Sequence, residues 1–234
     1  MEMQVTSKER CKSLLLRTHR IWSVVLPSSY RAYNLEGGWI YLNIKESHKM
    51  LERVLRCYEP WRYQALRHFL RPGFTFVDVG CNKGDFCLAA SRLVGPEGRV
   101  LAFEPHPENC RWIRKSIARN QYRNIDLYDV ALSDTNGVAH LCLGETSGQH
   151  TLLGEGRTAK RGFIEVQTRT LDHLLDDIGL SRPVDAIKID VEGAEMHVLR
   201  GARETFIKNR GIVVLLDLHP NLGVNVGELC EFSK

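Results

Sequence analysis

The sequence predicts an α/β protein with a doubly wound, mainly parallel sheet. The first observation is that short runs of β-branched and aromatic residues alternate with longer runs whose apolar residues recur at helical spacing. The second is that a glycine-bearing turn follows the first strong strand, Phe74–Val79. The third is the length of 234 residues, which suffices for one well-filled α/β domain and an N-terminal extension.

Residues 1–70 are expected to form this N-terminal extension, which is mainly helical with one short strand. The run Trp39–Ile44 predicts the strand, because it is rich in apolar residues and follows a Gly37–Gly38 turn. From Ser47 to Leu70 the pattern is helical, with an interruption at Glu59–Pro60.

Residues 71–234 are expected to form the main domain. Strands are predicted over Phe74–Val79, Arg99–Phe103, Ile125–Leu132, Asp185–Asp190 and Gly211–Asp217, with further extended runs at Val138–Leu143 and Phe163–Thr168. Helices are predicted from Phe86 to Leu93, from Pro107 to Ile117, from a Thr170 cap to Gly179, and from Ala194 to Ile207. Repeated strand–helix–strand units imply parallel strands joined by right-handed crossovers, with ligands bound at the carboxyl ends of the strands.

The composition is that of an ordinary globular protein, with 43% hydrophobic and 26% charged residues. No apolar run reaches the roughly 20 residues of a membrane span, and charged residues interrupt the apolar N-terminus, which argues against a signal peptide. Seven cysteines without a C-x-x-C pair indicate reduced thiols, so a cytoplasmic location is expected. The net charge of +4 is too small to imply nucleic acid, although basic residues gather near the N-terminus.

Two carboxylates and a glycine loop predict a nucleoside site. Asp78 directly precedes the turn that contains Gly80 and Gly84, and the G-x-x-x-G spacing lacks the third glycine of a nicotinamide-binding fingerprint. A carboxylate there suits a cationic or hydroxyl-rich ligand better than a phosphate. Glu104 ends the second strand of the domain, where a carboxylate can accept hydrogen bonds from both ribose hydroxyls.

Several ordered blocks give the chain a family resemblance. The blocks are Tyr58-Glu59-Pro60, Phe76–Gly84, Ala102–Pro105, Val130–Asp134, Thr170-Leu171-Asp172 and Ile187–Glu195. From Trp39 to His219 the sequence resembles the FkbM-type family of S-adenosylmethionine-dependent methyltransferases. The resemblance implies a Rossmann-like class I methyltransferase fold and S-adenosylmethionine as cofactor. Cys81 stands where the family usually has a small residue such as alanine.

The resemblance also implies a set of donor-binding residues. Asp78, Gly80, Asn82 and Gly84 would line the amino-acid and sulfonium end of the donor, Glu104 its ribose, and Asp129, Val130 and Ala131 its adenine. The full expected set is Glu59, Asp78, Gly80, Cys81, Asn82, Gly84, Glu104, Pro105, Asp129, Val130 and Ala131.

The family is associated mainly with O-methylation, so the expected acceptor is a hydroxyl of a sugar, glycan or polyketide-like small molecule. Alkyl hydroxyls are poor nucleophiles, so a general base or a metal is expected as well. The expected catalytic residues are Lys188, Asp190, Glu192 and His219. His219 is the natural titrating base and Asp190 would orient the hydroxyl or that base, whereas Lys188 could equally neutralise a buried carboxylate. Carboxylates at Asp190, Asp217 and Glu192 would suit Mg²⁺. The pattern is explained better if one of these carboxylates caps the following helix, so no metal site is predicted.

Two other readings stay open. A nucleic-acid methyltransferase fits the basic N-terminus, but the chain lacks the D/N/S-P-P-Y/F block used for exocyclic amino groups. A non-catalytic donor-binding module fits the short C-terminus: a complete fold of this class adds a helix and two closing strands, and Glu228–Phe232 can only begin that helix. Either the protein is naturally short, or its C-terminal strands are missing or supplied by a partner. An unfilled sheet edge would favour a homodimer.

Overall fold

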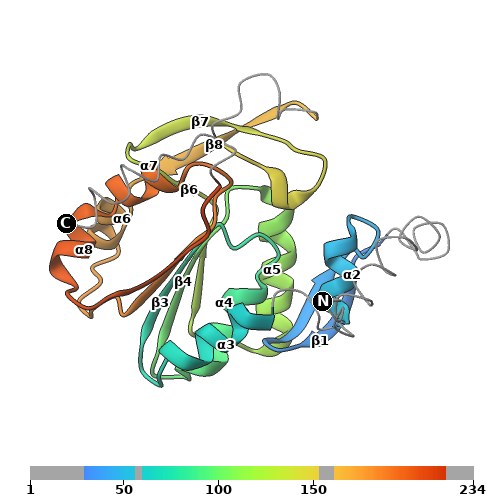
Figure 1. The fold of residues 1–234 in the computed structure, drawn as a ribbon, viewed down its shortest axis with the longest axis horizontal. Helices are drawn as coiled ribbons and strands as arrows, with labels where there is room; N and C mark the ends of the chain where they lie inside the picture. Colours follow the sequence, from blue (N-terminus) through green and yellow to red (C-terminus); the bar gives the residue numbers. More distant parts are fainter. Residues whose placement is uncertain (1–28, 56–59, 153–160, 220–234) are drawn as a thin grey trace, which may run out of the picture.

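The computed structural model describes residues 29–55, 60–152 and 161–219, and its centre is a five-stranded parallel sheet (Figure 1). The strands are β3 (Thr75–Val79), β4 (Arg99–Phe103), β5 (Ile125–Tyr128), β9 (Ala186–Ile189) and β10 (Val213–Leu216). Their order across the sheet is β10-β9-β3-β4-β5, and every neighbouring pair is parallel. The expected α/β architecture with a mainly parallel sheet is confirmed.

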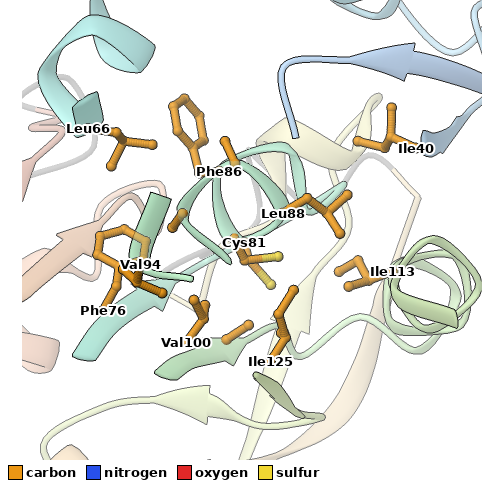
Figure 2. Close-up of a cluster of buried hydrophobic side chains, with 14 of the residues drawn as sticks. Ile40, Leu66, Phe76, Cys81, Phe86, Leu88, Val94, Val100, Ile113 and Ile125 are labelled. Atoms are coloured by element: carbon orange, nitrogen blue, oxygen red, sulfur yellow. The ribbon is translucent and has the colours of Figure 1, made fainter. Parts of the chain in front are cut away.

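Helices cover both faces of this sheet, as the doubly wound prediction requires (Figure 1). The helices are α4 (Asp85–Val94), α5 (Pro107–Asn120), α6 (Leu171–Asp177), α7 (Glu195–Arg200) and α8 (Arg203–Lys208). Successive strand residues point to opposite faces, so Phe76 packs with α4 and α5 while its neighbour Val77 packs with α6 and α7. Figure 2 shows the first of these clusters, in which Phe76 and Val100 gather with Leu88 and Ile113.

The segment before the sheet contains a β-hairpin and two helices. The hairpin pairs β1 (Arg31–Leu35) with β2 (Gly38–Leu42) in antiparallel register, and α2 (His48–Val54) and α3 (Pro60–Phe69) follow it. The expected strand corresponds to β2. A side chain of α5 accepts a hydrogen bond from the backbone of this edge strand, because the Trp39 N–H donates to Asn120 Oδ1 at 2.8 Å. Strand β1 was not predicted from the sequence, because Leu35 is its single buried residue and no alternation marks it.

A second, three-stranded sheet accounts for the extended runs of the middle of the domain. It contains β6 (Ala131–Leu132), β7 (Gly137–Cys142) and β8 (Phe163–Arg169) in the order β6-β8-β7. The single strand expected over Ile125–Leu132 is therefore two strands in two sheets. The reason is that β4 ends at Phe103, opposite Tyr128, so β5 has no partner beyond that point.

The helix expected over Ala194–Ile207 is also divided, into α7 and α8. The break lies at Gly201, where a Cβ atom would meet the Ser133 carbonyl oxygen at 2.0 Å. Further along the chain, residues 220–234, where the sequence places the start of another helix, lie outside the described residues. Within the described ranges no helix combines the length and apolarity that a membrane crossing needs.

Candidate active site

The candidate site is a pocket at the carboxyl ends of β3, β4 and β9. Between β3 and β9 the strand order reverses direction, which creates the crevice where open α/β sheets bind ligands. The expected site residues that line the pocket are Gly80, Cys81, Asn82, Glu104, Pro105, Val130, Ala131, Lys188, Asp190, Glu192 and His219. Asp78, Gly84 and Asp129 do not line it, and Glu59 lies outside the described residues.

The turn after β3 brings the backbone of two strands into contact. Gly80 has φ +74°, and a Cβ atom there would meet the Asp190 carbonyl oxygen at 2.1 Å. Only glycine combines this backbone conformation with so close an approach. The Gly80 and Cys81 N–H groups both donate to the Phe103 carbonyl at 3.0 Å, which fixes the turn against the end of β4.

Glu104 lies buried at the end of β4 and already accepts three hydrogen bonds. Its Oε2 accepts from the Asn82 N–H at 2.7 Å, and its Oε1 accepts from the His106 N–H at 2.9 Å and from Asn109 Nδ2 at 3.2 Å. Burial raises the pKa of Glu104 to about 7, against the effect of these donors. A carboxylate has about four lone-pair directions, so Glu104 keeps capacity to accept from a ligand hydroxyl.

Asp78 and Lys188 form a buried ion pair between β3 and β9. Lys188 Nζ lies 3.1 Å from Asp78 Oδ1 and also donates to the Gly80 carbonyl at 3.1 Å. Burial raises the pKa of Asp78. Burial opposes the charge of Lys188, yet the facing carboxylate of Asp78 raises the pKa of Lys188 above its ordinary value. Lys188 therefore neutralises a buried carboxylate, the role the sequence left open, while also reaching the pocket wall.

Arg62 is a site residue that the sequence did not single out. It comes from α3, and its guanidinium binds Asp190 Oδ2 at 3.0 Å and the carboxylate of Asp217. Burial acts to raise the pKa of Asp190, but the charges of Lys188 and Arg62 hold this pKa below its usual range. No sequence pattern distinguishes this arginine from others on a helical face, because only the tertiary fold brings α3 to the ends of β9 and β10.

His219 follows β10 and lies between two carboxylates. Its Nδ1 is 2.8 Å from Glu195 Oε1, and its Nε2 is 3.5 Å from Glu192 Oε2. The hydrogen bond to Glu195 is the main cause that raises the pKa of His219 to about 9. Glu195 lies in the block Ile187–Glu195 that carries the family resemblance, but the sequence assigned it no role. An acidic residue in the first turn of a helix usually serves the helix dipole.

One group of side chains has spacing that a metal could use. Ligand atoms of Asp190, Glu192 and His219 lie within 4.8 Å of one another. However, Asp190 already pairs with Arg62 and Lys188, and His219 is bound by two carboxylates, so cations of the protein occupy the places a metal would take. Within the described residues we therefore identify no metal ligands. The pocket instead offers a hydroxyl-accepting carboxylate, an apolar wall and an acidic end, which together suit a nucleoside with a cationic substituent.

Comparison with known proteins agrees with this chemistry. The family model described as methyltransferase FkbM domain matches residues 78–232. The 2-O-methyltransferase NoeI of Sinorhizobium fredii is 31% identical over 156 residues, which cover 61% of this chain and 63% of that protein. Methyltransferase 1 of Beauveria bassiana is 27% identical over 142 residues, which cover 53% of this chain and 57% of that protein. The chain thus spans less than two thirds of the length of either relative.

Among solved structures, a methyltransferase FkbM from Methylobacillus flagellatus aligns with a TM-score of 0.42 and 15% sequence identity. The alignment covers 88% of this chain and 49% of that one.

Proposed function

Because the chain belongs to the methyltransferase FkbM domain family, whose model matches residues 78–232, we propose that it transfers a methyl group from S-adenosylmethionine to a hydroxyl group. The acceptor that we propose is a sugar, a glycan or a polyketide-like small molecule. The relative from Sinorhizobium fredii is named a 2-O-methyltransferase, which supports oxygen as the accepting atom. The observation that carries the proposal is the switch-point pocket, with Glu104 on one wall and Asp190 and Glu192 on another.

The residues present fit this donor. Glu104 keeps lone pairs beyond its three protein hydrogen bonds, and these would accept from the ribose hydroxyls. Val130 and Ala131 would lie beside the adenine, and Gly80 and Asn82 would line the amino-acid and sulfonium end. When bound, the donor supplies an electrophilic methyl group on a positively charged sulfur, and the carbon–sulfur bond breaks with its electron pair remaining on the sulfur.

The acidic end of the pocket would serve the acceptor. A hydroxyl must lose its proton as its oxygen becomes alkylated, so a proton acceptor within hydrogen-bond reach of that oxygen is required. Asp190, Glu192, Asp217 and His219 are titratable groups on this part of the pocket wall, and Lys188 provides a fixed positive charge beside Asp190. We propose that Lys188, Asp190, Glu192 and His219 orient the hydroxyl and that one of the titratable groups among them receives its proton.

The first experiment is calorimetric titration of the full chain with S-adenosylmethionine. Glu104→Gln exchanges one carboxylate oxygen for a donor and is expected to weaken binding by about tenfold or more, as loss of a hydrogen bond to a charged group does. Glu165→Gln is the matched control, because Glu165 lies on β8 with 74% of its side chain exposed. Its affinity should equal that of the wild type.

The second experiment measures transfer of a labelled methyl group to methyl glycosides with free hydroxyls. Transfer that Glu104→Gln reduces and Glu165→Gln leaves unchanged would support the proposal. Donor binding without transfer to any hydroxylated acceptor would favour a non-catalytic donor-binding module. A folded wild type that does not bind the donor would refute the proposal.

We also propose that the chain works in the reducing cytoplasm. Cys81, Cys87 and Cys110 support this setting, because they are buried and form no disulfide.

A further inference from the structure

Both ring nitrogens of His219 face a carboxylate oxygen in the described structure. A neutral imidazole donates from one ring nitrogen and accepts at the other. Here Nδ1 faces Glu195 Oε1 at 2.8 Å and Nε2 faces Glu192 Oε2 at 3.5 Å. When both carboxylates are ionised, each faces a ring nitrogen that carries a proton, so this arrangement fits an imidazolium.

Glu195 is built to hold that cation. Its side chain is fully buried at the start of α7, and its Oε1 accepts from the Gly193 N–H at 3.1 Å as well as from His219. A buried carboxylate needs a charged partner, because desolvation of an unpaired charge is costly. The hydrogen bond that His219 donates to Glu195 is accordingly the largest of the causes that raise the pKa of His219 to about 9, and Glu192 and Asp190 add to it.

Glu192 has the features expected of a proton acceptor. It lines the pocket with 24% of its side chain exposed, and its backbone has φ +51°, a left-handed conformation that non-glycine residues adopt rarely and mostly at functional sites. Burial raises the pKa of Glu192 to about 7, and Asp190 and Asp217 act in the same direction while His219 and Lys49 oppose them. A base works best when its pKa lies near the operating pH.

We infer that Glu192 receives the proton of the acceptor hydroxyl, and that Glu195 is a positioning residue that keeps His219 as an imidazolium beside it. This inference rests on the proposed function and names the residue that receives the proton of the acceptor hydroxyl. As the hydroxyl oxygen bonds to the methyl carbon, the oxygen–hydrogen bond breaks and the proton passes to a Glu192 carboxylate oxygen. His219 keeps both its protons, and its positive charge lies beside Glu192, with Nε2 at 3.5 Å from Glu192 Oε2.

The charge states can be measured without turnover. In nuclear magnetic resonance titrations of the full chain, the His219 imidazole, assigned by loss of its signal in His219→Asn, is expected to titrate near 9. Glu195→Gln should move this value toward about 6.5, the ordinary value for histidine, and Glu165→Gln should not move it. The Glu192 carboxyl carbon is expected to titrate near 7. A wild-type His219 value near about 6.5, or a Glu192 value near about 4.3, would overturn the inference.

Rates provide the second readout once an accepting methyl glycoside is found. Glu192→Gln should lower the rate of methyl transfer by about 10²–10⁴-fold with little change in donor affinity, and Glu192→Asp should restore part of it. Glu195→Gln should instead shift the alkaline limb of the pH profile to lower pH. If His219→Asn abolishes transfer while Glu192→Gln retains it, His219 is the base. The inference then fails while the proposed function stands. If no acceptor is methylated, the proposed function fails, and the titrations still decide the charge arrangement.

Discussion

Lys188→Met tests how far the site depends on its buried ion pair. The substitution keeps most of the side-chain volume and removes the charge that faces Asp78, whose side chain is 0% exposed. Asp78 Oδ2 has no hydrogen-bond partner within the described residues, so Lys188 supplies the main compensation for this carboxylate. The Gly80 carbonyl loses its contact with Nζ at the same time.

The expected loss is large. Removing one partner of a buried ion pair costs about 3–5 kcal/mol, which is a substantial part of the roughly 5–15 kcal/mol that stabilises a domain. The pH dependence follows from Asp78. Burial already raises the pKa of Asp78, and the loss of Lys188 raises this pKa further. A group whose pKa is higher in the folded state stabilises fully below its unfolded pKa and loses that contribution as pH rises through its folded pKa. The variant should therefore approach the wild type as pH falls.

The assay is urea unfolding followed by circular dichroism at about pH 8 and about pH 5. Lys208→Met is the matched control, because Lys208 is exposed at the end of α8, and it should change the unfolding free energy by less than about 0.5 kcal/mol. The double variant Asp78→Asn/Lys188→Met should regain part of the loss, since it leaves no unpaired charge at position 78. A loss below about 1 kcal/mol for Lys188→Met, or no recovery in the double variant, would refute the reasoning.

Three further outcomes follow from the site. Affinity for S-adenosylmethionine should fall as pH drops through about 7, because protonation of Glu104 removes an acceptor from the ribose site; calorimetry across pH tests this, and a flat profile contradicts it. Gly80→Ala should lower the unfolding free energy by at least about 1–3 kcal/mol, since φ +74° and the Asp190 carbonyl at 2.1 Å both oppose a Cβ atom; an unchanged thermal unfolding temperature would contradict this. Asp129→Ala should change stability by less than about 1 kcal/mol and leave donor affinity unchanged, because its ion pair with Arg114 is exposed and it does not line the pocket; weakened donor binding would instead support the adenine role that the family resemblance implies.

The main strands could be predicted from sequence because burial on both faces leaves an unambiguous signal. All residues of β3 are buried, so the run Phe74–Val79 is apolar except for Thr75 and Asp78. The Thr170 cap was also predictable, and its side chain accepts from the His173 N–H. The boundary between β5 and β6 was not predictable, because apolar residues recur through both strands and only the change of partner strand separates them.

The site residues that directly follow a strand could be predicted from sequence. The residues that only tertiary packing brings to the site could not. Glu104 and Asp190 directly follow β4 and β9, and parallel strands bring their carboxyl ends to one edge. The sequence favoured His219 as the base because an ordinary histidine titrates near neutrality. Its contact with Glu195 depends on how α7 packs beside the end of β10, which no local pattern encodes.

The charges of the site explain why the segment before the sheet matters to it. Asp190 and Asp217 end neighbouring strands, and two carboxylates brought together repel each other unless a cation lies between them. Arg62 provides that cation from α3, and its planar guanidinium reaches both carboxylates at once. Lysine at this position would offer a single point charge, so Arg62→Lys should satisfy one carboxylate and not both. The segment before residue 71 thus completes the acidic end of the pocket as well as the hydrophobic core beneath it.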